Sequence, residues 1–327
     1  MNRRIRHLIA YGSSMIGLMV WQILFASLPA FTRLSSFHAD VVYSVVSQVL
    51  CMGLLPLGVL LSLGGMRANE TFRIMRYKAP KAKKSCALIC LGLMLLVTPF
   101  TMAFNSLTSL IFVIIGYKRG YGLGTIYLGA GDFVTMLAIT AVLPAVFEEF
   151  THRGVLLSGL EYRNSERTAI VISAVMFGLM HTNPSQMIFA TFGGIVFAYV
   201  VIKTDSIIPA MCAHFANNAV SVLLDYSLQK MNALGVWYDR MTGGSLLNVI
   251  VTFAVFALSL FAMVRLMQYA ARKTDKPVSE GHLFGVVTVD LYNPEGKATL
   301  KDNAVLYAVA IAESALLVAL LLWGILK

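Results

Sequence analysis

Long apolar stretches, separated by short polar or basic segments, set the pattern of this chain. A transmembrane helix needs about 20 consecutive, predominantly apolar residues. Beyond the apolar stretch at 86–110, apolar sequence continues to Tyr117, so one long or broken helix is expected there. The pattern predicts an all-α polytopic transmembrane helical bundle of about eight or nine spans, near 8–31, 40–65, 86–110, 133–160, 168–183, 184–203, 206–227, 245–268 and 303–326.

Two segments carry weaker signals. The first apolar run follows the basic "MNRRIRH" and shows no small-residue cleavage site, so we expect a retained signal anchor. Between the last two spans, residues 286–292 alternate weakly in polarity and "NPEG" follows as a turn signal. This pattern predicts a small cytoplasmic hairpin within about 276–302.

The composition agrees with a membrane protein. Hydrophobic residues make up 58% of the 327 and charged residues 13%, against about 45–50% and about 25% in soluble domains. The net charge of +10 does not indicate nucleic-acid binding, because the basic residues lie at the ends of apolar runs. The four cysteines lie in or beside apolar segments, where a free cysteine packs as a small hydrophobe.

The basic residues also predict the orientation of the chain. Cytoplasmic loops of membrane proteins carry an excess of lysine and arginine. With nine spans and a cytoplasmic N-terminus, the inside segments hold 19 of these residues and the outside segments hold six, with Arg153 left out as intramembrane. We therefore expect a multi-pass protein of the cell membrane with a cytoplasmic N-terminus, although Lys118 and Arg119 do not fit this pattern.

The fourth span contains charges where none are expected. Its sequence "AVLPAVFEEFTHRGVLL" places Glu149 and Arg153 one helical turn apart, so an ion pair can offset the cost of burying both. Glu148 lies about 100° around the helix from Glu149, and its carboxylate is left for chemistry. His152 follows Glu148 by four residues, and we expect it to serve in helix packing or local hydrogen bonding.

Two later spans carry similar polar pairs. "FGLMH" places Phe177 and His181 on one face, and "HFANN" does the same for His214 and Asn218. At 1.5 Å per residue, Glu148 and His181 both lie roughly 18–20 Å from the cytoplasmic end of their spans. His214 lies nearer 12 Å from that end, so its helix must tilt or begin irregularly. Ionisable groups inside a membrane indicate a functional site.

A carboxylate, two histidines and an amide at one depth suit peptide hydrolysis. Glu148, helped by His181, can activate water, while His214 and Asn218 can stabilise a tetrahedral oxyanion. Alternatively, Glu148, His181 and His214 can bind Zn²⁺ or another divalent metal and leave a position for water. The H-E-x-x-H signature of soluble zinc proteases is absent.

Three motifs in this order resemble the CPBP family of intramembrane proteases. "EEFTHR" fits EExxxR, "FGLMH" fits FxxxH and "HFANN" fits HxxxN, over roughly residues 130–228. The family includes the CAAX prenyl endopeptidases and the Abi group of bacteriocin-processing and immunity proteins. The resemblance implies that Glu148 and His181 activate water, that His214 and Asn218 form the oxyanion site, and that Glu149 pairs with Arg153. Both metal-dependent and metal-free glutamate mechanisms are argued for the family.

The resemblance divides the chain into three segments. We expect N-terminal helices with a basic loop at 1–129, the protease core at 130–228 and C-terminal helices at 229–327. The expected partners are a membrane-associated protein or peptide substrate and the lipid bilayer, and no nucleic acid. The alternatives are a non-proteolytic scaffold or immunity protein with the same fold and, less well supported, a proton-coupled transporter, because the polar residues cluster at one level.

Overall fold

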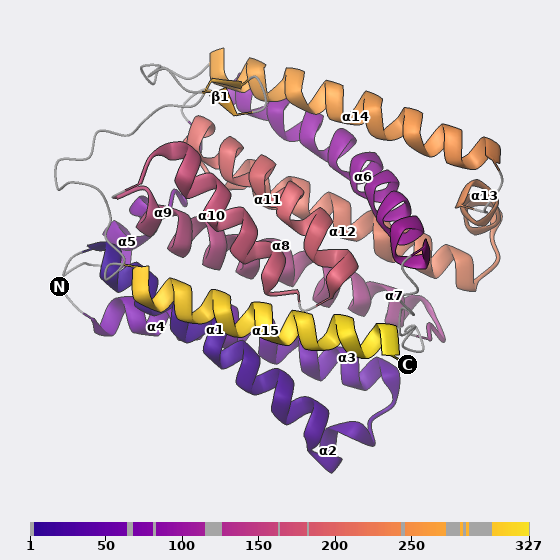
Figure 1. Ribbon diagram of the computed structural model, residues 1–327, viewed down its shortest axis with the longest axis horizontal. Coiled ribbons are helices and arrows are strands. Elements are labelled where there is room, and N and C mark those ends of the chain that lie inside the picture. The colour runs from indigo at the N-terminus through magenta and orange to yellow at the C-terminus, as the bar shows by residue number, and fades with distance from the viewer. Residues whose placement is uncertain are drawn as a thin grey trace.

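The protein is an elongated bundle of helices (Figure 1). The structure is a computed structural model and describes residues 3–63, 68–80, 83–114, 126–162, 164–181, 183–242, 246–272, 282–283, 286–287 and 303–326. The first half contains α1 (Arg3–Ser27), α2 (Pro29–Thr32), α3 (Ser36–Val45), the π-helical η1 (Val46–Leu54), α4 (Leu55–Ser62), α5 (Ala68–Ile74) and α6 (Lys83–Ile114).

The second half begins with one continuous helix of alternating α and π geometry. It comprises α7 (Ala130–Leu137), η2 (Ala138–Val142), α8 (Leu143–Glu149), η3 (Phe150–Leu157) and α9 (Ser158–Leu160). The remaining elements are α10 (Glu166–Leu179), α11 (Pro184–Thr204), α12 (Ile208–Gln229), α13 (Ala233–Thr242), α14 (Leu246–Arg272), β1 (His282–Leu283), β2 (Val286–Val287) and α15 (Ala304–Leu326).

The predicted polytopic bundle is confirmed, with an approximate number of spans. Each predicted apolar stretch contains helix in the described chain, and six of the described helices are long and apolar enough to cross a membrane. The third stretch is one 32-residue helix, α6, with Pro99 inside it. By contrast, α10 has 14 residues and is about 21 Å long, less than the roughly 30 Å of a bilayer core.

The strands that the structure describes lie within the predicted 276–302 segment, but they begin before the residues predicted to form the hairpin. The antiparallel pair joins His282 to Val287 and Leu283 to Val286. Both strands lie before the predicted "NPEG" turn. The segment around that turn lies outside the described residues.

Three layers of helices build the bundle. In Figure 1, α6 and α14 lie along one side, α1, α3 and α15 along the other, and α8 to α12 between them. The two chain ends are marked at opposite ends of the bundle. On the outer side of α14, Leu258 and Phe261 are 69% and 66% exposed. The long apolar stretches therefore supply both the packed interior and an apolar surface suited to lipid.

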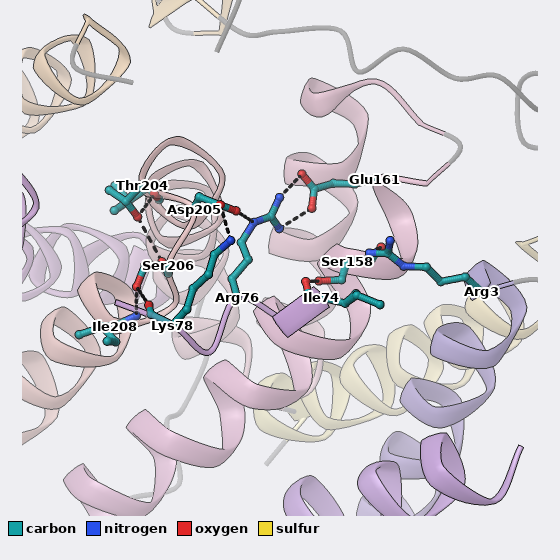
Figure 2. A network of polar contacts seen from close by, with 11 residues as sticks. Arg3, Ile74, Arg76, Lys78, Ser158, Glu161, Thr204, Asp205, Ser206 and Ile208 are labelled. Atoms are coloured by element: carbon teal, nitrogen blue, oxygen red, sulfur yellow. Dashed lines mark hydrogen bonds and ion pairs between the residues drawn. The ribbon is translucent and has the colours of Figure 1, made fainter. Parts of the chain in front are cut away.

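One end of the bundle is fastened by an ion-pair network around Arg76 (Figure 2). The Arg76 guanidinium contacts Glu161 at 2.5 and 2.9 Å and Asp205 at 3.1 Å, and Lys78 Nζ lies 2.5 Å from Asp205. The backbone nitrogen of Ile207 donates to the Arg76 carbonyl at 3.1 Å. The basic loop before α6 thereby joins the end of α9 to the start of α12.

The charges in this network compensate one another. Burial alone would lower the pKa of Arg76, but Glu161 and Asp205 outweigh burial and hold that pKa above its usual value. Arg76 and Asp205 also have φ angles of 61° and 51°, a left-handed conformation that costs a non-glycine residue roughly 1 kcal/mol or more. The ion pairs and the backbone bond hold both residues in this conformation.

Two adjacent glycines of α11 provide a test of how closely α10 and α11 pack. A Cβ at Gly194 would lie 2.9 Å from the Ala174 Cα, whereas a Cβ at Gly193 would meet nothing within 4 Å. We expect Gly194→Ala to destabilise the fold by about 1–3 kcal/mol through overpacking. Gly193→Ala is the matched control and should cause no loss. Thermal unfolding of both variants in detergent checks this, and equal losses would contradict the close approach.

Candidate active site

The helix from Ala130 to Leu160 carries the two adjacent glutamates into the interior. Glu148 and Glu149 end the α-helical turn of α8, and the π-helical η3 begins at the next residue. Both side chains are buried, at 7% and 0% exposure. π-helical turns are rare and are found frequently at functional sites.

Glu149 forms the predicted ion pair and a second contact that the motif spacing did not indicate. Its Oε1 accepts from Arg153 Nη1 at 3.0 Å and from His214 Nδ1 at 2.9 Å. Arg153 is also fully buried, lies 4.1 Å from the centre of the Phe177 ring and donates to the Gly194 carbonyl at 3.4 Å. The pair thus connects the central helix to α10, α11 and α12.

Glu148 has a different environment. Its Oε1 accepts from Gln48 Nε2 at 2.8 Å. Its Oε2 lies 3.8 Å from His214 Nε2, longer than a hydrogen bond, and this buried oxygen has no hydrogen-bond partner among the described residues. One carboxylate oxygen is therefore fixed by η1 while the other faces the second histidine.

His181 lies just beyond α10 rather than within a continuous helix as predicted. The helix ends at Leu179, and the His181 backbone nitrogen donates to the Gly178 carbonyl at 3.2 Å in the turn that follows. The His181 ring uses Nδ1 to donate to the Phe177 carbonyl at 2.8 Å. Because a carbonyl only accepts, Nε2 is the nitrogen left for chemistry.

Asn218 is held by two neighbours. Its Nδ2 donates to the Thr140 carbonyl at 3.0 Å, and its Oδ1 accepts from Asn217 at 3.2 Å. Asn217 is itself hydrogen-bonded to Thr101 of α6. One N–H of the Asn218 amide remains for another acceptor.

A cavity of about 220 Å³ brings these groups together. Glu148, His181, His214 and Asn218 all line it, as does Phe177. The cavity also receives residues from the N-terminal helices, which lie far from the motifs in sequence. These are Tyr43, Ser44, Ser47, Gln48, Val97 and Thr101.

His152 lies outside this cavity lining and serves in packing. It is fully buried, its Nε2 lies 3.0 Å from Met180 Sδ, and its ring meets those of Tyr11 and Phe177 edge to face. The Phe177 ring also meets the His181 ring edge to face, with 5.1 Å between ring centres. Phe177 therefore supports Arg153, His152 and His181 at once.

The donor groups do not form a metal site in this arrangement. Within the described part of the chain, no three histidine, cysteine, aspartate or glutamate side chains are grouped to hold a metal ion. The possible ligands were Glu148, His181 and His214. His214 uses Nδ1 on Glu149 and His181 uses Nδ1 on Phe177, so in each ring Nε2 is the nitrogen left to face the cavity.

Sequence reasoning missed two members of the site. Gln48, inside the apolar stretch at 40–65, and Asn217, next to Asn218, are not among the predicted site residues. A lone glutamine in the middle of an apolar span was a usable signal, because polar groups inside a membrane seek partners. The sequence offers no comparable signal for which glutamate Gln48 contacts.

Comparisons with known proteins agree with the motifs. Residues 130–220 match the model of the family described as type II CAAX prenyl endopeptidase Rce1-like. The matched segment contains all three motifs and confirms the resemblance to the CPBP family of membrane proteases. No curated protein and no solved structure matches the chain.

The adjacent glutamates are expected to differ in their effect on stability. Glu149→Gln keeps the shape of the side chain but leaves the buried Arg153 charge uncompensated, which costs about 3–5 kcal/mol. Glu148→Gln removes a carboxylate that forms no ion pair with a lysine or arginine among the described residues. This variant should therefore change the stability of the fold little. Thermal unfolding in detergent measures both. A larger loss in the Glu148 variant would show that Glu149 is not the structural carboxylate.

Proposed function

We propose that this multi-pass membrane protein is an intramembrane endopeptidase. It hydrolyses a peptide bond of a membrane-associated protein or peptide. The observation that carries the proposal is the shared cavity, which is lined by Glu148, His181, His214 and Asn218 inside a segment that matches the endopeptidase family. The predicted orientation, with the N-terminus in the cytoplasm of a cell-membrane protein, is part of the proposal.

In the proposed reaction, Glu148 acts as the general base. Its Oε2 is the carboxylate oxygen without a hydrogen-bond partner among the described residues, so it is available to take a proton from water. The His181 Nε2 orients the same water. The resulting oxygen nucleophile attacks the scissile carbonyl carbon, and the proton on Glu148 then passes to the departing amine.

The oxyanion is stabilised from α12. His214 donates Nδ1–H to Glu149 and approaches the oxyanion through Nε2, and it can donate from both nitrogens because it acts here as the imidazolium. Asn218 contributes its remaining amide N–H, with the side chain fixed by Thr140 and Asn217. Hydrogen-bond donors that are fixed before the reaction stabilise the transition state most strongly in a site that excludes water.

Glu149 and Arg153 act as positioning residues in this proposal. Glu149 fixes the His214 ring through a 2.9 Å hydrogen bond, and Arg153 balances the buried charge of Glu149. The proposed steps use only the side chains of this protein.

The decisive variant is Glu148→Gln. Loss of a general base lowers the rate by about 10²–10⁴-fold, so we expect cleavage by this variant to fall by that factor. His181→Ala should give a loss in the same direction. The purified protein is incubated in detergent with a membrane proteome. The measurement counts the new peptide N-termini that wild type releases and the Glu148→Gln variant does not.

Glu70→Gln is the matched control, because Glu70 is an exposed glutamate of α5 that lies outside the cavity. It should cleave at the wild-type rate. If the Glu148 variant cleaves as fast as this control, the proposed mechanism is wrong. If Glu148→Gln instead preserves the biological function in cells, a non-proteolytic scaffold replaces the enzyme.

Gln48 is expected to support the reaction from outside the matched segment. Gln48→Leu removes the hydrogen bond that fixes Glu148, and hydrogen bonds to charged groups are worth about 1.5–3 kcal/mol. We expect kcat to fall by roughly tenfold or more while KM stays unchanged. Steady-state kinetics checks this, with Ser44→Ala in the same cavity as the control. A rise in KM at constant kcat would instead assign Gln48 to substrate binding.

A further inference from the structure

A second cavity continues from the first. It has a volume of about 430 Å³ and shares six lining residues with the active-site cavity. The shared residues are Thr101, Thr140, Gln186, Phe189, Asn217 and Asn218. The two volumes therefore meet at the proposed oxyanion site.

The second cavity follows one face of α12 away from the active site. Asn218, Ser221 and Asp225 line it at helical spacing, and Ser106 of α6 faces it from the neighbouring helix. An extended peptide inside a membrane protein needs partners for its backbone N–H and C=O groups. Amide and hydroxyl side chains along the cavity can supply them.

Asp225 gives the far part of this cavity a negative charge. No lysine or arginine is among the residues that line either cavity, and within the described chain no lysine or arginine forms an ion pair with Asp225. The nearby Lys230 donates to the Tyr127 carbonyl at 3.0 Å and lines neither cavity. Tyr127 also hydrogen-bonds the Asp225 carboxylate, which holds that side chain in place.

The spacing along α12 sets a distance from the scissile bond. Asp225 follows Asn218 by seven residues, a rise of about 10 Å at 1.5 Å per residue. An extended peptide advances about 3.3 Å per residue. A substrate residue beside Asp225 therefore lies about three residues from the bond held at Asn218.

We propose that the second cavity binds an extended segment of the substrate and that Asp225 selects a lysine or arginine about three residues from the cleaved bond. This specificity rests on the proposed protease function. The expected substrates are peptides with a basic residue at a fixed distance from the cleavage site.

The test uses the full-length protein, purified in detergent, and a peptide library made by digesting a whole proteome. Mass spectrometry identifies the cleavage sites that wild type produces and Glu148→Gln does not. We expect lysine and arginine to be enriched about fivefold at one position, the factor for a partly exposed ion pair. Asp225→Asn should remove the enrichment, and Asp225→Lys should replace it with aspartate and glutamate.

The controls separate specificity from folding and from catalysis. Thermal unfolding of Asp225→Asn in detergent should match that of wild type, which shows that the variant is folded. Asp239→Asn, on the neighbouring α13 and outside both cavities, should keep the enrichment.

Two results would overturn the inference in different ways. Glu148-dependent sites without basic enrichment, or an enrichment that survives Asp225→Asn, would reject the role of Asp225 and leave the protease function standing. The absence of any Glu148-dependent site would reject the protease function and the proposed specificity together.

Discussion

A fully buried carboxylate, that of Glu149, is the constraint on which the arrangement depends. A charge inside a membrane bundle must be compensated where it lies. One oxygen of Glu149 meets both Arg153 on its own helix and His214 on α12. The same contacts that neutralise the charge also fix the distance between the central helix and α12, and so they position the groups that face the cavity.

The remaining polar groups are arranged around this fixed pair. Phe177 lies against the Arg153 guanidinium and orients His181 through its carbonyl, so α10 is tied to the same centre. Gln48, in the π-helical η1, donates a hydrogen bond to Glu148. These contacts together restrict the positions of Glu148, His181 and Arg153.

Much of this arrangement of polar groups could be predicted from the sequence, because a buried charge needs a compensating partner and few residues can provide one. The pairing of Glu149 with Arg153 followed from a four-residue spacing, and the common depth of Glu148 and His181 from helix lengths. The turn that carries His181 could not be predicted, because "FGLMH" is apolar enough to continue a helix. Nor could the contact of Gln48, because apolar periodicity does not specify which helices become neighbours in a membrane bundle.

The walls of the two cavities come partly from residues outside the matched segment. The proposed catalytic groups lie within residues 130–220, whereas Tyr43, Gln48 and Thr101 line the same cavity from before that segment. Ser221 and Asp225 line the adjoining second cavity from after it. Mutations outside the matched segment can therefore change the walls of the cavity without touching a motif. Chains with identical motifs are free to diverge in what they accept, and a match to the family model does not by itself transfer a substrate from one chain to another.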